Sequence, residues 1–325
     1  MQRRTFSHFI AGSLGAGLLG GHAAVRAQAP FPSKNITLVY PWPPGGPGDV
    51  LSRLYAQKCG QRLNETIVVD TRPGATGAIG LSFAARAAAD GYTLALASVD
   101  THAINPNFND KITYKALEDF KSVGGVGRIP MALCVNAQGP YKDMAGFVAA
   151  AKAKPQSLTY ASWGNGSLAH VTMALVARQA GIEAVHVPYQ GAAPALTGMI
   201  GGQVDAMVLP FSMAWANAQG GKIRILGTTT IKRVAQDIPT LAEQGLPVEV
   251  HNWFGLVVPS KTPAAIIGLL SKETLAVVKQ TDWAEALKPH WIEPYPATAE
   301  EFDAMVLKEH QRWKTIMSEL NIKQV

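Results

Sequence analysis

The feature that most constrains the fold is a unit that recurs along the chain: an apolar strand, a glycine-rich turn and then a helix. Ile36–Val39 is a β-branched, apolar run that leads through a Pro/Gly segment, residues 41–48, into an amphipathic helix expected to begin near Asp49. The same order returns at residues 66–89, and a further strand follows at 92–97. Parallel strands need crossover connections, which are usually helical, so this repetition predicts an α/β fold with right-handed crossovers.

The Pro/Gly segment is the first candidate for a ligand site. Unpaired N–H groups at a helix N-terminus can bind an anion without any charged side chain. The sequence therefore predicts an anion, such as a carboxylate, beside Trp42, Pro44, Gly45 and Gly46, with Asp49 shaping the loop. A rigid turn in which Asp49 only caps the helix accounts for the segment equally well on its own.

Two types of nucleotide-binding loop can be compared with this segment. Gly46 and Gly48 fit the first two glycines of a dinucleotide fingerprint, and Asp70 ends the next strand near the expected spacing. However, Leu51 stands at the third glycine position, and the prolines of the segment remove amides that a pyrophosphate would use. A phosphate-binding loop would need Gly-Lys-Ser/Thr, where this chain has Gly-Asp-Val at 48–50. Nucleotide binding is disfavoured, and no cofactor is predicted.

The first 29 residues have the features of a targeting segment. Arg3 and Arg4 precede an apolar run, residues 9–21, and Ala-Gln-Ala at 27–29 has the form of a cleavage site. The run is shorter than the roughly 18 to 20 residues that span a bilayer, so we expect removal rather than anchoring. The paired arginines are compatible with twin-arginine export, although many ordinary signal peptides also begin with two basic residues. The predicted location is the periplasm, with a mature chain that is not embedded in the membrane.

Residues 30–325 are long enough for one large or two medium domains. The formal charge of +6 falls to +3 without the three arginines of the leader, and no Lys/Arg run with interleaved aromatics supports nucleic-acid binding. Cys59 lies on the core face of a helical pattern and Cys134 within an apolar strand, which predicts two buried free thiols. With so few cysteines and scattered histidines, no metal site is predicted.

Polar residues at later strand ends extend the candidate site. Ser98, Thr101 and His102 follow the strand at 92–97, and the turn 162–167 parallels the opening loop. Ligands collect at the carboxyl ends of parallel strands, so we expect the two turns to face one ligand, although each polar side chain serves equally well as a cap or a loop hydrogen-bonding group. The predicted ligand-binding residues are Trp42, Pro44, Gly45, Gly46, Asp49, Ser98, Thr101, His102, Ser162, Trp163, Asn165, Gly166, Ser167, His170, Gly191 and Asp205.

Two extended segments predict how the chain divides. A glycine-rich stretch at 121–127 precedes an extended run at 128–135, and residues 253–258 form a second extended run. We expect them to connect one lobe, residues 30–128 and 253–325, with another, residues 129–252. The terminal helices, which carry a capping box at 298–301, are expected to pack on the first lobe.

Seven short stretches carry a family likeness. They are PWPPGGPGD at 41–49, RPGATG at 72–77, DGYTL at 90–94, HAINP at 102–106, SWGNGSLAH at 162–170, HVPY at 186–189 and GGQVD at 201–205. With these stretches in this order, the chain resembles the periplasmic substrate-binding receptors of the tripartite tricarboxylate transporter family, also called Bug-type receptors. The likeness covers essentially all of the mature length.

The resemblance implies a two-lobed periplasmic-binding-protein fold, of the Venus flytrap, type II-like kind, in which each lobe is a mixed, mainly parallel sheet flanked by helices. It implies a monomeric receptor that closes on a small organic acid, holds the carboxylate through backbone amides and ordered water, and delivers it to membrane transporter subunits. Gly48, Trp163 and Leu209 depart from the family pattern, so the ligand's identity does not transfer. Trp42 and Trp163 are compatible with an aromatic acid, or with simple packing of a lobe.

An enzyme is the main alternative class, namely a nucleotide- or carboxylate-dependent α/β enzyme that uses the same glycine-rich loops. Gly166-Ser167 does not form a nucleophile elbow, and no Ser/His/Asp set or carboxylate pair is evident. A structural or adhesive protein has no use for two clustered glycine-loop helix ends. We therefore predict a receptor without catalysis, whose ligand carboxylate lies between the helix after Gly46 and the helix after Gly166. On this hypothesis, Gly46→Val should impair binding more than Ser162→Ala.

Overall fold

Apolar, β-branched strands form the centre of the fold. In the computed structural model, which describes residues 31–322, β1 (Ile36–Tyr40) lies between β2 (Ile67–Thr71) and β3 (Thr93–Ser98) and runs parallel to both. Four of the five residues of β1 are buried, as expected where helices cover both faces of a sheet. The predicted signal segment lies outside the described residues.

Helix α1 (Pro47–Leu63) begins two residues before the expected start at Asp49. Gly46 is the N-cap and Pro47 the first helical residue, where the missing N–H of proline costs nothing. Asp49 is instead the third residue of the helix, and its Oδ2 accepts a hydrogen bond from the N–H of Gly45 at 3.1 Å. The carboxylate thus closes the glycine loop from inside the helix.

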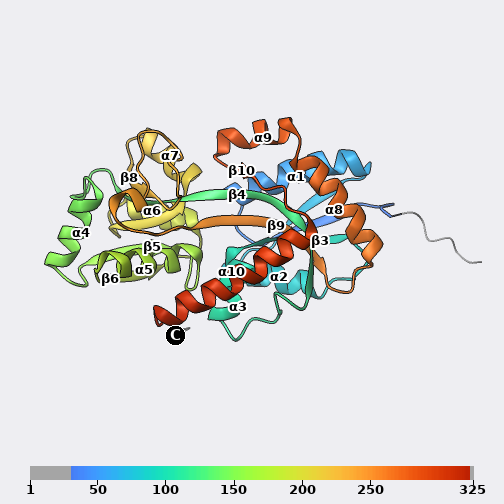
Figure 1. Cartoon of the computed structure of the whole chain (residues 1–325), viewed down its shortest axis with the longest axis horizontal. Helices are drawn as coiled ribbons and strands as arrows, with labels where there is room; N and C mark the ends of the chain where they lie inside the picture. The colour runs from blue at the N-terminus through green and yellow to red at the C-terminus, as the bar shows by residue number, and fades with distance from the viewer. Residues whose placement is uncertain (1–30, 323–325) are drawn as a thin grey trace, which may run out of the picture. The chain divides into compact units, whose positions relative to one another are not determined.

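The two predicted extended segments belong to two long paired strands, β4 (Phe120–Asn136) and β9 (His251–Pro259). Figure 1 shows them running side by side through the centre of the described chain. The glycine-rich stretch at 121–127 is part of β4, where the register with β9 shifts after Ser122 and again after Gly125. Such irregularities bend and twist a strand locally. The glycine-rich stretch, which was expected to connect the two lobes, is therefore a bulged part of a strand.

The second half of β4 belongs to another set of strands. It pairs antiparallel with β7 (Ala206–Pro210) and β8 (Ile223–Thr228), and β5 (Leu158–Ser162) runs parallel to both β7 and β6 (Ala184–Pro188). The sheet order is β2-β1-β3-β9-β4-β7-β5-β6, with β8 and β10 (Glu293–Pro294) also paired to β4. The helices between these strands are α4 (Met144–Ala153), α5 (Leu168–Ala180), α6 (Ala192–Ile200) and α7 (Phe211–Gln219).

Short turns and the C-terminal helices complete the fold. The turns and short helices are η1 (Ala75–Gly77), α2 (Ala78–Ala85), the π-helical turn η2 (Asp100–Ile104), α3 (Asn105–Phe108), η3 (Ala242–Gln244) and η4 (Lys288–His290). The last helices are α8 (Ala264–Val278), α9 (Thr281–Leu287) and α10 (Ala299–Glu319). The predicted capping box of α10 is confirmed, because Thr298 and Glu301 exchange side-chain to backbone hydrogen bonds. None of the helices among residues 31–322 has both the length and the apolar character of a membrane span.

Helix α10 contacts more of the chain than expected. It packs on β4 and η2, but Arg178 at the end of α5 also pairs with Glu319 at 3.1 Å. In addition, Arg312 donates a hydrogen bond to the backbone carbonyl of Glu249. Beyond the expected packing on the first set of segments, α10 therefore also reaches residues of the segment 129–252.

Three clusters of buried side chains make up the core. The largest lies under α10, α4 and α5 and includes Phe147, Phe302 and Trp313, all less than 2 % exposed. A second cluster joins α1, α8 and α9 to the sheet, with Trp283 at its centre. A third packs α6 and α7 on the strands around Phe211. Every one of these large side chains is fully buried, so each helix is fixed to the sheet by packing.

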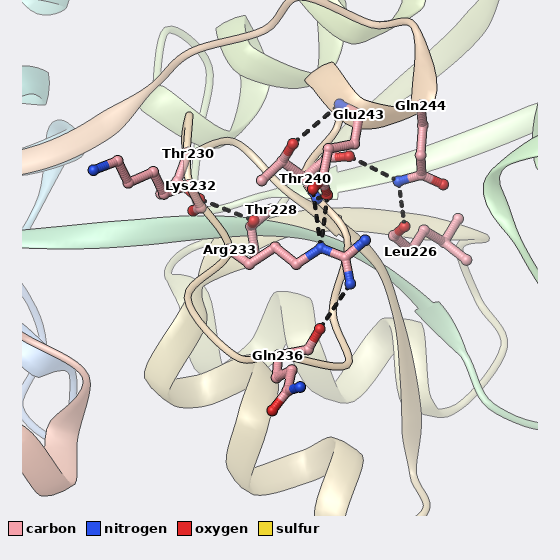
Figure 2. A network of polar contacts seen from close by, with 9 residues as sticks. All are labelled: Leu226, Thr228, Thr230, Lys232, Arg233, Gln236, Thr240, Glu243 and Gln244. Carbon is pink, nitrogen blue, oxygen red and sulfur yellow. Dashed lines mark hydrogen bonds and ion pairs between the residues drawn. The ribbon is translucent and has the colours of Figure 1, made fainter.

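A polar network fixes the loop that leads from β8 back into β9 (Figure 2). Arg233 donates from Nε to both carboxylate oxygens of Glu243, at 3.0 and 2.9 Å, and from Nη1 to the carbonyl of Gln236. Glu243 also accepts the N–H of Thr240, whose Oγ1 in turn accepts the N–H of Glu243. This loop ends at the start of β9, so the network positions the strand that reaches the cavity described below.

Both cysteines are buried and unpaired, as predicted. Burial raises the pKa of the Cys59 thiol to about 11 and that of Cys134 well above its ordinary value. Because the thiolate is the reactive form, neither thiol should react with a disulfide reagent such as DTNB in the folded protein. We expect both to react once denaturant unfolds the chain. A full equivalent of thiol titrated under native conditions would contradict the packing described for these two residues.

Candidate functional site

A cavity of about 480 Å³ lies where turns from the two sets of strands meet. This volume is typical of sites for small molecules. One side is formed by segments that follow β1, β2 and β3, the other by segments that follow β5, β6 and β7, and β9 contributes two residues. The lining residues are Tyr40, Trp42–Gly48, Pro73–Gly77, Asp100, Trp163, Gln190–Pro194, Pro210, Met213, Asn252 and Phe254.

Ten of the 24 residues that line the cavity are aromatic residues or prolines. The ring of Trp42 meets Phe254 edge to face at 5.9 Å and lies 5.7 Å from Tyr40. Successive side chains of a strand point to opposite faces, so Asn252 and Phe254 project from the same face of β9. Trp253, between them, packs on the other face against Phe302 of α10 at 5.5 Å. One face of β9 therefore forms the cavity wall and the other belongs to the core.

The N-terminus of α6 supplies backbone donors at the cavity. Its N-cap is Gly191, and no side chain caps the helix. Ala192 and Ala193 are its first residues, and within the described chain no hydrogen-bond acceptor is found for their N–H groups. Both residues line the cavity. Unpaired amides at a helix N-terminus, where the positive end of the helix dipole also lies, are suited to an anion.

The loop at residues 74–77 has an unusual backbone conformation. Gly74, Ala75, Thr76 and Gly77 all have positive φ, and Ala75 and Thr76 are in the left-handed region at 47° and 53°. Such a conformation is strained for residues other than glycine, and it occurs preferentially at binding sites. The loop is held by Asn105, whose Nδ2 donates to the carbonyl of Thr76 at 2.9 Å. All four residues line the cavity, so the strain is located at the candidate site.

The N-terminus of α5 is already occupied by a carboxylate of the chain. Asp100, in η2, accepts the N–H of Leu168 at 2.6 Å and the indole N–H of Trp163 at 3.0 Å. Burial raises the pKa of this carboxyl to about 6. The hypothesis that a ligand carboxylate bridges the N-termini of α1 and α5 does not fit this geometry, because Asp100 takes the place of that anion at α5. At α1, Asp49 accepts the N–H of Gly45, a loop amide that precedes the N-cap.

The structure gives no reason for the expected strong effect of Gly46→Val on binding. Its φ of −84° is an ordinary value, and a Cβ atom there would meet only the hydroxyl of Tyr40, at 3.6 Å. The argument that a β-branched residue at Gly46 distorts the loop is therefore not supported. Gly191 is the more sensitive position, because its φ of 133° is one that side chains other than glycine rarely adopt.

Three of the predicted residues lie beneath the cavity and support Asp100. The Oγ of Ser98 accepts the N–H of Asp100 at 3.1 Å, and the Oγ1 of Thr101 accepts the N–H of Ser98 at 3.0 Å. His102 contacts the same Thr101 hydroxyl through Nδ1. All are buried and none lines the cavity. They hold the turn that presents Asp100.

Another group of predicted residues organises the turn before α5. The rings of His170 and His186 stack at 3.8 Å, and Ser162 Oγ lies 2.7 Å from His186 Nε2. Gly166 donates its N–H to Nδ1 of His170 at 3.1 Å, and burial lowers the pKa values of His170 and His186 to about 4 and about 3. The pair is therefore neutral at pH 7 and shapes the turn from outside the cavity.

Asp205 lies at the wrong end of the sheet for a ligand contact. Its Oδ2 accepts both the N–H and the hydroxyl of Thr159, near the start of β5, whereas the cavity lies beyond the end of that strand. Ser167 caps α5 by accepting the N–H of His170. Asn165 is exposed in the same turn. Within residues 31–322, no group of three or more His, Cys, Asp and Glu residues is arranged to hold a metal ion.

The structure brings six of the predicted residues to the cavity. They are Trp42, Pro44, Gly45, Gly46, Trp163 and Gly191. The ten that it does not bring there are Asp49, Ser98, Thr101, His102, Ser162, Asn165, Gly166, Ser167, His170 and Asp205. The prediction missed Asp100, Asn252 and the loop at 73–77. That loop carried a signal in its RPGATG stretch, and Asn252 stands out as an amide next to an apolar strand.

Comparisons with known proteins agree on one family. A family model described as tripartite tricarboxylate transporter family receptor matches residues 51–322. A UPF0065 protein in the tcbD-tcbE intergenic region of Pseudomonas sp. strain P51 is 33% identical over 92% of this chain and 91% of its own length. Protein BugT of Bordetella pertussis is 31% identical over 93% of this chain and 94% of its own length.

Solved structures show the same fold. Rpa4515 of R. palustris, determined with adipate, superposes with a TM-score of 0.87 at 30% identity, over 91% of this chain and all of that one. MatC of Rhodopseudomonas palustris, with bound malate, gives a TM-score of 0.81 at 29% identity over 88% and 99% of the two chains. A structure of the periplasmic binding protein BugD gives 0.83 at 26% identity, over 91% of this chain and all of that one. The expected two-lobed periplasmic-binding-protein fold is confirmed by these likenesses.

Proposed function

Because this chain belongs to the tripartite tricarboxylate transporter receptor family, we propose that it captures a small organic carboxylate in the cavity between its lobes. The observation that carries the proposal is the uncapped N-terminus of α6 at the wall of a largely apolar cavity. Two relatives of the same fold were solved with the carboxylates adipate and malate. The receptor acts in the periplasm and delivers its ligand to membrane transporter subunits.

The proposed carboxylate contacts are backbone groups. The N–H groups of Ala192 and Ala193 receive the anion, and the loop that contains Ala75 and Thr76 lines the same cavity. A helix end stabilises an anion by roughly 0.3–1 kcal/mol, and by up to about 2 where it is partly buried. Hydrogen bonds to a charged acceptor contribute roughly 1.5–3 kcal/mol each. Affinity should therefore depend more on the backbone than on any one side chain.

The proposed lobes are residues 30–128 with 253–325, and residues 129–252. The pairing of β4 supports this division: residues from Phe120 to Pro130 pair with β9, and residues from Met131 onward pair with β7 and β8. The change of partners falls two residues after the proposed boundary. The cavity-lining residues before 129 or after 252 then face Trp163 and the turn at 190–194.

An enzyme that uses the same loops is not favoured. The described residues that line the cavity include no Ser, Cys, His or Lys, and neither of the two hydroxyl residues there, Tyr40 and Thr76, is hydrogen-bonded to a side-chain base. Asp100 is the carboxylic acid among them, and both of its oxygens already accept hydrogen bonds. The site therefore has the chemistry of a binding cavity.

Gly191→Val should weaken carboxylate binding at least tenfold, because it strains the backbone that presents the α6 amides. The matched control is Gly202→Val, which also has positive φ but has open space around it and does not line the cavity. Thermal-shift screening of the mature protein with adipate, malate, benzoate and their amides identifies a ligand, since 100 times the Kd adds about 2.7 kcal/mol of stability. Calorimetry then measures both variants. Amides that bind as tightly as the acids would refute the proposal.

A further inference from the structure

Asn252 carries an unsatisfied polar atom at the cavity. Its side chain lies in β9, opposite Ile129 of β4, and is only 7 % exposed. Its Oδ1 is buried without a hydrogen-bond partner among the described residues, and the residue lines the cavity. Buried amide oxygens are nearly always hydrogen-bonded in folded proteins, because desolvation without a partner is unfavourable. Of the nine buried side-chain atoms that lack a partner among the described residues, this is the only one whose residue lines the cavity, so a molecule bound there can supply the missing donor.

The surrounding residues give no structural reason for an amide at this position. The neighbours of Asn252 on the same face and in the next positions are Phe254, Trp253 and Val250, all buried and apolar. An apolar residue would fill this place without leaving an unsatisfied atom. An amide both accepts and donates hydrogen bonds, so its natural partner on a ligand is a neutral hydroxyl or amino group.

The rest of the wall favours a flat, aromatic body for the ligand. Trp42 lies on one side of the cavity and Trp163 on the other, and Tyr40 and Phe254 adjoin Trp42. Aromatic rings pack against one another edge to face or offset, which gives them an advantage over an aliphatic chain of equal size. A cavity of about 480 Å³ holds one substituted ring.

The charges around the cavity disfavour a second carboxylate. Among the described lining residues there is no Lys, Arg or His, so no side-chain cation could neutralise another anionic group. Asp100 would repel it. A neutral hydroxyl or amino group at Asn252 avoids both penalties and satisfies the buried oxygen.

We propose that the ligand is an aromatic monocarboxylate whose ring bears a hydroxyl or amino group, and that Asn252 selects this group. This inference rests on the proposed function, since it assigns the carboxylate to the α6 amides. The aromatic residues from the two sides of the cavity then pack against the ring, and Asn252 forms a hydrogen bond with its hydroxyl or amino group.

Calorimetry on the mature protein tests the inference with benzoate, the three hydroxybenzoate isomers, cyclohexanecarboxylate, adipate and malate. At least one hydroxybenzoate should bind at least tenfold more tightly than benzoate, and benzoate more tightly than cyclohexanecarboxylate. In Asn252→Ala, the advantage of that isomer over benzoate should shrink to less than threefold. Asn252→Leu, which keeps the side-chain volume, should give the same result if the alanine variant folds poorly. The control Asn321→Ala, at an exposed position, should keep the wild-type ratio.

The outcomes separate the two proposals. Tight binding of adipate or malate, with aromatic acids weaker, would overturn the aromatic ligand and leave the carboxylate receptor standing. A hydroxyl advantage that persists in both Asn252 variants would overturn the role of Asn252. Failure of every acid, aromatic and aliphatic, to bind at millimolar concentration would overturn the proposed function itself, and this inference with it.

Discussion

Asp100→Asn is expected to weaken ligand binding by roughly 5- to 150-fold, which corresponds to about 1–3 kcal/mol for a buried donor left without its acceptor. Asp100 uses one carboxylate oxygen for the N–H of Leu168 and the other for the indole N–H of Trp163. Asparagine offers one acceptor oxygen and places an NH₂ group against the second donor. Because these bonds join the turn after β3 to the turn after β5, they hold the two sides of the cavity together around a ligand.

Calorimetry with the acid identified by thermal shift measures this loss. Asp143→Asn provides the matched control, because Asp143 caps α4 at an exposed site and accepts the N–H of Gly146. Its affinity should equal that of the wild type. If Asp100→Asn bound the acid as tightly as the control does, Asp100 would have no part in holding the cavity closed.

Asp100 should also make the free energy of unfolding depend on pH, with lower stability at higher pH. Burial raises the pKa of Asp100 to about 6 in the folded protein, above the ordinary value of 3.8. The folded state therefore favours the protonated form, and the contribution of this group to the free energy of unfolding is largest below pH 4 and is lost as the pH rises through 6. Asp100→Asn should remove this component. Urea unfolding of both proteins between pH 4 and 7 would show it as a difference in slope.

Phe302→Ala should lower the free energy of unfolding by about 3–5 kcal/mol, the usual cost of removing a large buried aromatic ring. Phe302 is fully buried on α10, and its ring packs against Trp253 at 5.5 Å. Gly255 of β9 lies directly beneath this ring, and a Cβ atom there would overlap it. The ring thus fills the space that the glycine leaves, and the surrounding strands cannot easily collapse into the cavity that alanine would create.

Urea unfolding at pH 7 measures this effect, with Leu307→Ala on the same helix as the control, because Leu307 is 47 % exposed. The control should change the free energy by no more than about 0.5 kcal/mol. Gly255→Ala should be destabilising in the wild-type background and less so beside Phe302→Ala, since the two positions share one space. A loss below 1 kcal/mol for Phe302→Ala would mean that α10 is not anchored by this ring.

The order of elements was predictable because each strand and helix carries its own local pattern. The strands at 36–39 and 92–97 were placed to within one residue from their apolar residues, and the capping box at Thr298 from its spacing. Helix α7 was missed, because β7 passes through Pro210 directly into Phe211 with no glycine turn between them. The start of α1 was misplaced because Asp49 suits both a cap and a first-turn position.

The candidate site was harder to predict because it depends on contacts between distant segments. A helix N-terminus looks the same in sequence whether a ligand or another part of the chain supplies its anion. Only the fold shows that Asp100 reaches Leu168, 68 residues later. Ser98, Thr101 and His102 were correctly placed after a strand, yet their hydrogen bonds hold the turn that presents Asp100, and they do not line the cavity. Asn252 stands out in the sequence as an amide next to an apolar run, but only the fold shows that its Oδ1 is buried without a partner and that the residue lines the cavity.

The two faces of β9 have a consequence for how a ligand enters. Asn252 and Phe254 line the cavity, whereas Trp253 and Gly255 pack against Phe302 of α10 on the opposite side. Helix α10, which belongs to the first proposed lobe, also contacts the second, through Glu319 with Arg178 and through Arg312 with the carbonyl of Glu249. Contacts of one helix with both proposed lobes oppose their separation on that side, so we expect the lobes to separate on the opposite side. Ligand entry and release should occur at the edge of the cavity away from α10.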